Sequence, residues 1–136
     1  MKPCLPESEY VLSNDSFESH INALGNGYLK ARGCFLTSHR PSSDDGLFFF
    51  VRDVDSGTYW SATPAPVFAH PDRFRMEVGT RSAHIERQDG AMETLSDILV
   101  PRVGDFEIRR LTITNHDACA HQLEVTSSVD IILLFD

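Results

Sequence analysis

The sequence predicts an all-β protein built as an antiparallel β-sandwich. Short segments with alternating apolar and polar residues recur along the chain, separated by clusters of Gly, Pro, Asn, Asp and Ser. This arrangement is typical of short strands joined by tight turns. Helical spacing of apolar residues, at every third and fourth position, is not sustained over any segment of about ten residues or more. The short, regularly spaced strands therefore favour a sandwich.

The chain is long enough for one domain with one core. It has 136 residues, of which 41% are hydrophobic and 24% are charged, as expected for a globular protein. The formal net charge is −8, and no cluster of Lys or Arg offsets it locally. Because such a chain repels phosphate backbones, nucleic acid is not expected as a partner.

Cysteine usage and the N-terminus predict a cytoplasmic protein. The three cysteines, Cys4, Cys34 and Cys119, are an odd number without metal-ligand spacing, which argues against a disulfide framework and a zinc site. Residues 1–10 contain prolines and glutamates where a secretory signal needs an apolar run. No apolar stretch approaches the length of a membrane span.

Residues 1–20 are expected to form a loosely ordered lead-in, and residues 21–136 the β-sandwich domain. The lead-in is polar and interrupted by prolines, and only Tyr10–Leu12 reads as a short strand. In Leu24–Thr37, the Asn26-Gly27 pair predicts a turn that a strand follows, because this dipeptide tolerates positive φ.

A β-hairpin is predicted after a loop at residues 39–46. Leu47–Asp53 reads as its first strand, residues 54–57 supply Asp and Gly for the turn, and Thr58–Ala62 returns. A Pro-rich crossing over residues 63–71 leads to three further strands, which are expected to form a meander. These strands are Phe74–Val78, Ala83–Arg87 and Met92–Val100, with Asp89-Gly90 joining the last two.

The clearest period-two alternation lies near the end of the chain, where one face is predicted to be buried. The apolar residues of this face are Leu123, Val125, Val129, Ile131 and Leu133.

In the preceding strand, the parity of the apolar residues changes. Phe106 and Ile108 share one parity, whereas Leu111 and Ile113 share the other. We therefore predict a β-bulge at Arg109-Arg110.

Asp53 and Asp55 form a carboxylate pair that needs explanation. Two carboxylates one residue apart can hold a divalent cation, as in many sugar-nucleotide transferases, but here no nucleotide-binding α/β unit precedes them. The remaining ligands of a calcium loop are absent as well. Since Asp is common in turns, turn formation is expected to explain both residues.

Other residue types with chemical potential form no recognisable pattern. The six histidines show no compact ligand spacing, residues 24–28 lack the spacing of a phosphate loop, and Cys34 does not lie in a nucleophile elbow. The 20 acidic residues identify no acid and base pair for glycoside cleavage. We therefore expect no catalytic residue, no cofactor and no metal site.

Tyr59 and Trp60 are the best candidates for contact with a sugar. An aromatic ring can pack against the apolar face of a pyranose, while the nearby Arg52 and Asp53 can hydrogen-bond hydroxyl groups. A single Trp on a strand is more often a core residue or an anchor at a domain interface. Both interpretations stay open for these four residues.

Three segments, taken in order, resemble a known family. FFFVRDVDSGTYWSAT (Phe48–Thr63), RQDGAMET (Arg87–Thr94) and EIRRLTITNH (Glu107–His116) are similar to the N-terminal β-sandwich of glycoside hydrolase family 94. This family includes cellobiose phosphorylases and the phosphorylase-like part of cyclic β-1,2-glucan synthases. The segment LGNGYLKARGCF (Leu24–Phe35) instead looks like the family 65 phosphorylases.

The resemblance implies a supersandwich similar to galactose mutarotase, in an accessory role. In family 94 a catalytic (α/α)6 barrel follows the sandwich, and the complete enzymes cleave β-glucosidic bonds with inorganic phosphate and inversion. The motifs of the barrel do not occur here, so no catalytic residue is transferred to this chain. The barrel is therefore the implied partner, in the same or a longer protein, and a homodimer and a β-glucan oligosaccharide are further partners that the resemblance leaves open.

The last residues, IILLFD, bear on whether the domain is whole. An apolar strand at an unpaired edge is an aggregation hazard, so we expect the domain to be truncated at its C-terminus. Two alternatives to the accessory role remain, a free-standing carbohydrate-binding module and an inactive remnant.

Overall fold

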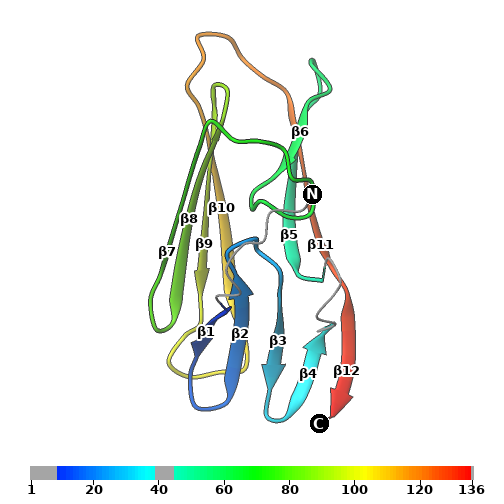
Figure 1. Ribbon diagram of the computed structural model, residues 1–136, viewed down its shortest axis with the longest axis vertical. Coiled ribbons are helices and arrows are strands. Elements are labelled where there is room, and N and C mark those ends of the chain that lie inside the picture. The colour runs from blue at the N-terminus through cyan, green and yellow to red at the C-terminus, as the bar shows by residue number, and fades with distance from the viewer. Residues whose placement is uncertain (1–8, 39–44, 136) are drawn as a thin grey trace.

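The computed structural model describes residues 9–38 and 45–135. All regular structure in these residues is β-strand, and the twelve strands form three antiparallel sheets (Figure 1). The predicted all-β antiparallel fold class is therefore confirmed. In these residues no helix is long and apolar enough to cross a membrane. The loop predicted at residues 39–46 lies largely outside the described residues.

A four-stranded sheet contains the predicted meander. Its hydrogen-bonded order is β10-β9-β8-β7, so neighbours in the sheet are also neighbours in the sequence. Gly90 has a φ of 59° in the turn between the second and third of these strands, a conformation that favours glycine. In chain order, the strands are β7 (Arg73–Val78), β8 (Ser82–Asp89), β9 (Met92–Leu99) and β10 (Ile108–Asn115).

The bulge predicted at Arg109-Arg110 is wrong. β10 pairs with β9 along its whole length without a shift of register. Arg109 shares its parity with Leu111 and Ile113, and these side chains are partly buried, whereas Ile108 is exposed on the other face. Phe106 precedes the strand. One uninterrupted alternation from Ile108 onward therefore accounts for the pattern.

A three-stranded sheet contains the predicted hairpin. β5 (Leu47–Asp53) and β6 (Tyr59–Ser61) pair as antiparallel neighbours, and β11 (Leu123–Val129) pairs with the other side of β5. Gly57 closes the turn with a φ of 73°. The Asp and Gly signals of this turn therefore predicted the hairpin correctly.

A five-stranded sheet unites both ends of the described chain. Its order is β1-β2-β3-β4-β12. The strands are β1 (Glu9–Ser13), β2 (Phe17–Asn22), β3 (Gly27–Ala31), β4 (Cys34–Thr37) and β12 (Ile131–Phe135).

Residues 9–20 differ from the predicted loose lead-in. β1 extends the short strand predicted at Tyr10–Leu12, and most of β2 also falls in this segment. Leu12 and Phe17 are buried, and the side chain of Asn14 accepts hydrogen bonds from the backbone N–H groups of Ser16 and Phe17. The polar residues between the strands therefore form a tight turn instead of a loose segment. Residues 1–8 lie outside the described part.

The segment Leu24–Thr37 contains two strands where one was predicted. A second turn lies at Arg32-Gly33, where both residues have positive φ, 49° and 78°. Gly27 begins β3 instead of lying in the first turn. A Cβ atom on Gly27 would come 1.8 Å from the carbonyl oxygen of His20, so the close approach of two backbones requires glycine here.

The five-stranded sheet and the three-stranded sheet both pack against the four-stranded sheet, and the core has two parts. In one part, Leu12, Phe17 and Ile21 meet Ile85 and Ile98 across the sandwich. In the other part, the hairpin of β5 and β6 packs against β9 and β10. This second part is centred on Val51, Trp60 and Met92.

The face predicted to be buried at the end of the chain is largely exposed. Leu123 is partly buried, but Val125 and Val129 are 51% and 41% exposed, and Ile131 and Leu133 are 74% and 73% exposed. β11 pairs only with β5, and β12 only with β4, so both strands lie at sheet margins in the described structure (Figure 1). Alternation shows which residues share a face of a strand, but it does not show whether another layer of the protein covers that face.

Candidate functional site

The β5–β6 hairpin places the four predicted contact residues on two faces. Arg52 lies opposite Tyr59, and Val51 lies opposite Trp60 in the register of the hairpin. Because side chains alternate along a strand, Arg52 and Tyr59 point outward, whereas Asp53 and Trp60 are buried. The four residues therefore do not converge on one site.

Trp60 occupies the position of a core residue. Its side chain is 3% exposed and packs with Val51 and Met92, with Leu111 and Ile113 nearby. A sugar cannot stack on a ring that is covered in this way. Of the two interpretations of Trp60, the structure fits the core.

Arg52 and Tyr59 form an exposed polar and aromatic row. Tyr59 is 58% exposed, and Arg52 Nη1 donates to Glu124 Oε2 at 3.2 Å. Glu124 lies opposite Arg52 on β11, so the row crosses the three-stranded sheet. Of the four predicted contact residues, Arg52 and Tyr59 are the two whose side chains a ligand in solution can reach.

Asp53 is held at the centre of a turn and an ion-pair chain. Its Oδ1 accepts the backbone N–H groups of Asp55 and Ser56, at 3.0 and 3.3 Å. Its Oδ2 lies 2.9 Å from His121 Nδ1, and His121 Nε2 lies 2.8 Å from Asp117 Oδ2. The hairpin turn is thereby fastened to the loop that precedes β11.

The three charged groups of this ion-pair network, Asp53, His121 and Asp117, shift one another's pKa values. The hydrogen bonds to Asp117 and Asp53 raise the pKa of His121. Those from His121 lower the pKa of each carboxyl group. Each group therefore favours its charged form. Among residues 9–38 and 45–135, no group of three or more His, Cys, Asp and Glu side chains could hold a metal ion.

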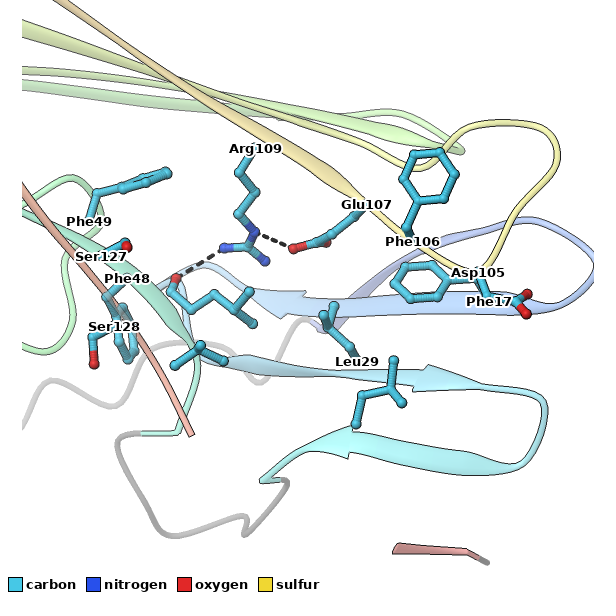
Figure 2. Close-up of a pocket in the computed structure, with 13 residues that line it drawn as sticks. Phe17, Leu29, Phe48, Phe49, Asp105, Phe106, Glu107, Arg109, Ser127 and Ser128 are labelled. Atoms are coloured by element: carbon cyan, nitrogen blue, oxygen red, sulfur yellow. Dashed lines mark hydrogen bonds and ion pairs between the residues drawn. The ribbon is translucent and has the colours of Figure 1, made fainter. Parts of the chain in front are cut away.

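A pocket of about 440 Å³ lies where the three sheets meet (Figure 2). Phe17, Leu29 and Leu36 line it from the five-stranded sheet, and the segment that leads into β10 lines it from another side. β5 and β11 close the third side. The residues that these two sides contribute are Leu47, Phe48, Phe49, Asp105, Phe106, Glu107, Arg109, Ser127, Ser128 and Val129.

The charged groups inside the pocket already have partners. Arg109 Nε donates to Glu107 Oε1, and Arg109 Nη1 donates to the carbonyl oxygen of Leu47 at 3.0 Å (Figure 2). Glu107 Oε2 accepts the hydroxyl hydrogen bond of Ser19 at 2.6 Å. The remaining lining is mainly Phe, Leu and Val. The pocket is therefore suited to apolar groups, because its ion pair is satisfied internally.

Glu107 and Arg109 were not predicted as site residues. The signal was present in the sequence, because Arg109 shares its parity with Leu111 and Ile113. Because a bulge was predicted at Arg109, the sequence did not assign its side chain to either face of the strand. The structure places it on the partly buried face, with Leu111 and Ile113. Its pairing with Glu107 and Leu47 depends on the meeting of separate sheets, which a local pattern does not show.

Comparison with known proteins identifies matches for almost the whole chain. Residues 4–135 match the family model of the glycosyl hydrolase 94 supersandwich domain. The cyclic beta-(1,2)-glucan synthase NdvB of Rhizobium meliloti (strain 1021) is 29% identical over 129 residues, or 93% of this chain. The 3-O-beta-D-glucopyranosyl-beta-D-glucuronide phosphorylase of Paenibacillus borealis is 25% identical over 104 residues, or 76% of this chain.

The matched regions are small parts of both relatives. They amount to 5% of the glucan synthase and 13% of the phosphorylase. The domain thus occurs in these relatives as one part of a much longer polypeptide.

Proposed function

Because this chain belongs to the family of glycosyl hydrolase 94 supersandwich domains, we propose that it supports a catalytic (α/α)6 barrel in a glycoside phosphorylase or cyclic β-1,2-glucan synthase. The observation that carries this proposal is the family match over residues 4–135. The small share of each relative that the domain occupies supports an accessory role. The barrel belongs to the same protein or to a longer one.

The chemistry of the described residues supports a non-catalytic role. Two carboxylates line the pocket. Glu107 is bound by Arg109 and Ser19, and Asp105 is bound by Arg32 and Ser16. Outside the pocket, Asp53 is bound by a turn and by His121. A general acid needs a carboxyl group that can reach the glycosidic oxygen of a substrate. The three carboxylates instead stabilise contacts between segments of the chain.

The proposed activity of the complete protein is cleavage or transfer at β-glucosidic bonds. In phosphorolysis, an oxygen of inorganic phosphate attacks the anomeric carbon while the bond to the leaving sugar breaks. The products are a sugar 1-phosphate and a sugar that has gained a proton. One relative is named as a phosphorylase and the other as a glucan synthase, and the proposal covers both contexts.

An assay of two polypeptides tests this role. The complete natural polypeptide should release a sugar 1-phosphate from β-linked gluco-oligosaccharides with inorganic phosphate, or should extend a β-1,2-glucan. The 136-residue chain should do neither. Activity of the 136-residue chain alone would overturn the accessory role. A naturally expressed polypeptide with a mass of only 15.2 kDa would overturn it as well.

A free-standing carbohydrate-binding role is the second candidate. The exposed row of Arg52, Tyr59 and Glu124 favours it, because it combines an aromatic ring with charged hydrogen-bonding groups. Titration with β-glucan oligosaccharides should then show binding that Tyr59→Ala abolishes without a change in circular dichroism. Equal binding by Tyr59→Ala and the unchanged chain would eliminate this row as the site.

Location and oligomeric state form the last part of the proposal. We place the protein in the cytoplasm, since Cys34 and Cys119 are unpaired thiols among the described residues. A homodimer of the complete protein is consistent with the resemblance to family 94. Cell fractionation and sedimentation equilibrium measurements test these two statements separately.

A further inference from the structure

Phe68 combines a strained backbone with an exposed aromatic ring. It has a φ of 57°, in the left-handed region that a bulky side chain rarely adopts, and it is 51% exposed. Among the described residues, Arg32 is the one other non-glycine residue with positive φ. Arg32 lies in a hairpin turn with Gly33, where this conformation is ordinary. Phe68 instead lies on the crossing between β6 and β7, which belong to different sheets.

Hydrogen bonds hold the crossing on both sides of Phe68. The N–H group of Phe68 donates to the carbonyl oxygen of Pro64 at 2.8 Å. On the other side, the carbonyl oxygen of Ala69 accepts a hydrogen bond from the buried Arg87 at 2.8 Å. Backbone strain persists where the surroundings determine the conformation, and such residues cluster at functional sites. The crossing therefore holds the backbone of an exposed aromatic residue in a fixed position.

The crossing passes beside the strand that carries Tyr59. The N–H group of Val67 donates to Ser61 Oγ at 3.4 Å. Ser61 shares its face of β6 with Tyr59, because side chains alternate along a strand. Phe68 follows Val67 directly, so two exposed aromatic residues lie on neighbouring segments at this margin of the three-stranded sheet.

Polar groups suited to hydroxyl groups lie beside Tyr59. Arg52 is its partner in the register of the hairpin, and Glu124 is the partner of Arg52 on β11. Their ion pair is exposed, and an exposed pair of this kind contributes little to stability, so a ligand can replace it readily. An aromatic ring packs against the apolar face of a pyranose, while charged groups hydrogen-bond its hydroxyls. The combination therefore fits a sugar better than a wholly apolar partner.

We propose that Phe68 is an aromatic contact for a β-linked glucan chain, next to the row of Arg52, Tyr59 and Glu124. The ring packs on one glucose unit, and the charged pair hydrogen-bonds the hydroxyl groups of another unit. The proposal rests on the proposed function, which supplies the class of sugar, and it adds a second aromatic residue to the surface. Because the crossing is held in place without the sugar, little ordering of this segment is needed on binding.

Phe68→Gly separates a sugar contact from a structural role. Glycine adopts positive φ without strain, so we expect the melting temperature of the 136-residue chain to stay the same or to rise by about 2–4 °C. Titration calorimetry with a linear β-1,2-gluco-oligosaccharide should nevertheless show affinity that is roughly 3- to 10-fold weaker than that of the unchanged chain. A purely structural role predicts the reverse, a lower melting temperature and unchanged affinity.

Val103→Ala is the matched control for the loss of an exposed apolar side chain. Val103 is 85% exposed and lies on the connection between β9 and β10, at the end of the molecule opposite the turn of β5 and β6 (Figure 1). This variant should bind the sugar as the unchanged chain does. An α-linked malto-oligosaccharide of the same length should bind more weakly. Equal affinity of Phe68→Gly and the unchanged chain, or equal affinity for the two sugars, would overturn the proposal.

The activity of the complete natural polypeptide distinguishes failure of this contact from failure of the accessory function. If the folded 136-residue chain binds no glucan but the complete polypeptide is an active phosphorylase or glucan synthase, the contact is wrong and the accessory function stands. If binding depends on Phe68 but the complete polypeptide is inactive, the contact is supported and the accessory function is overturned.

A third outcome would identify a protein partner for the ring instead of a sugar. Phe68→Gly would then lower the melting temperature of the complete polypeptide, but not that of the 136-residue chain, and would leave glucan binding unchanged. The ring of Phe68 would then contact another part of the protein, and this result would overturn the proposal.

Discussion

His121 Nδ1 lies 2.9 Å from Asp53 Oδ2, so a histidine before β11 fastens the turn of the β5–β6 hairpin. The other ring nitrogen contacts Asp117 at 2.8 Å. The imidazole is therefore placed between two carboxylates that favour its charged form. This arrangement makes the attachment of the hairpin dependent on pH.

The direction of this pH dependence follows from the pKa shifts. The raised pKa of His121 gives stability that is fully present below the ordinary value of 6.5 and is lost as pH rises through the raised value. The lowered pKa values of Asp53 and Asp117 give stability that is present above 3.8 and is lost as pH falls through the lowered values. The contribution of the attachment is therefore greatest between these limits.

We predict that His121→Gln removes this dependence. The loss in melting temperature relative to the unchanged chain should be larger at pH 6 than at pH 9. His70→Gln is the matched control, since His70 is exposed, and it should change the melting temperature little at either pH. A difference between the unchanged chain and His121→Gln that is constant with pH would contradict the assignment.

Trp60 and Tyr59 are neighbours with opposite roles, and substitution should separate them. Trp60→Ala should lower the free energy of unfolding by about 3–5 kcal/mol, because it removes a large side chain from the core. Tyr59→Ala should change it by no more than about 0.5 kcal/mol, since this side chain faces water. Denaturation in urea measures both changes.

The fluorescence of Trp60 gives an independent check. It is the single Trp of the chain and is 3% exposed, so its emission reports on one buried site. We expect emission at shorter wavelength than that of free tryptophan and weak quenching by iodide. Strong quenching in the folded chain would contradict the core position.

Local sequence patterns predicted the elements that depend on neighbouring residues. The hairpin of β5 and β6 and the meander of β7, β8 and β9 are bounded by turn residues such as Gly57 and Gly90, whose positive φ is a local requirement. β2 was missed because prolines and polar residues before it suggested disorder. Its inward residues, Phe17, Ser19 and Ile21, nevertheless alternate with polar ones.

The site depended on contacts between distant segments and was less predictable. Arg109 on β10 donates a hydrogen bond to the carbonyl oxygen of Leu47 on β5, which belongs to another sheet. No spacing in the sequence predicts this contact. The exposed strand β12 shows a related limit, because the alternation of Ile131 and Leu133 does not reveal whether another layer covers them. Trp60 could be assigned to the core or to a sugar contact until its strand had a register.

Arg87 is a buried cation that anchors the crossing between β6 and β7. Its side chain is fully buried and donates to Asp89 and to the carbonyl oxygen of Ala69. Arg87→Met should lower the free energy of unfolding by about 3–5 kcal/mol, because it leaves the carboxylate of Asp89 without its partner. Thermal and urea denaturation check this value.

An exposed arginine provides the control for Arg87. Arg75 pairs with Glu77 on the surface of β7, and Arg75→Met should cost less than about 1 kcal/mol. If the two substitutions had equal effects, burial of the Arg87 ion pair would not be the cause. The variant R87M/D89N should recover part of the stability that R87M loses, since the unpaired charge is removed.

The ion pair of Glu107 and Arg109 connects β10 to β2 and β5, and its two members should show strong coupling. Arg109→Met removes the hydrogen bonds to Glu107 and to the carbonyl oxygen of Leu47. Within residues 9–38 and 45–135, the buried carboxylate of Glu107 then keeps only the hydroxyl group of Ser19 as a partner. We expect a loss of about 3–5 kcal/mol in the free energy of unfolding.

Replacing both charges tests whether the unpaired carboxylate causes that loss. E107M/R109M should be more stable than R109M alone, because two apolar side chains suit the Phe and Leu lining of the pocket. A double-mutant cycle measured by urea denaturation gives the coupling between the two residues, which we expect to exceed about 1 kcal/mol in magnitude for groups in direct contact. Additive losses would show that each side chain acts alone, and the ion pair would then not be what joins the three sheets around the pocket.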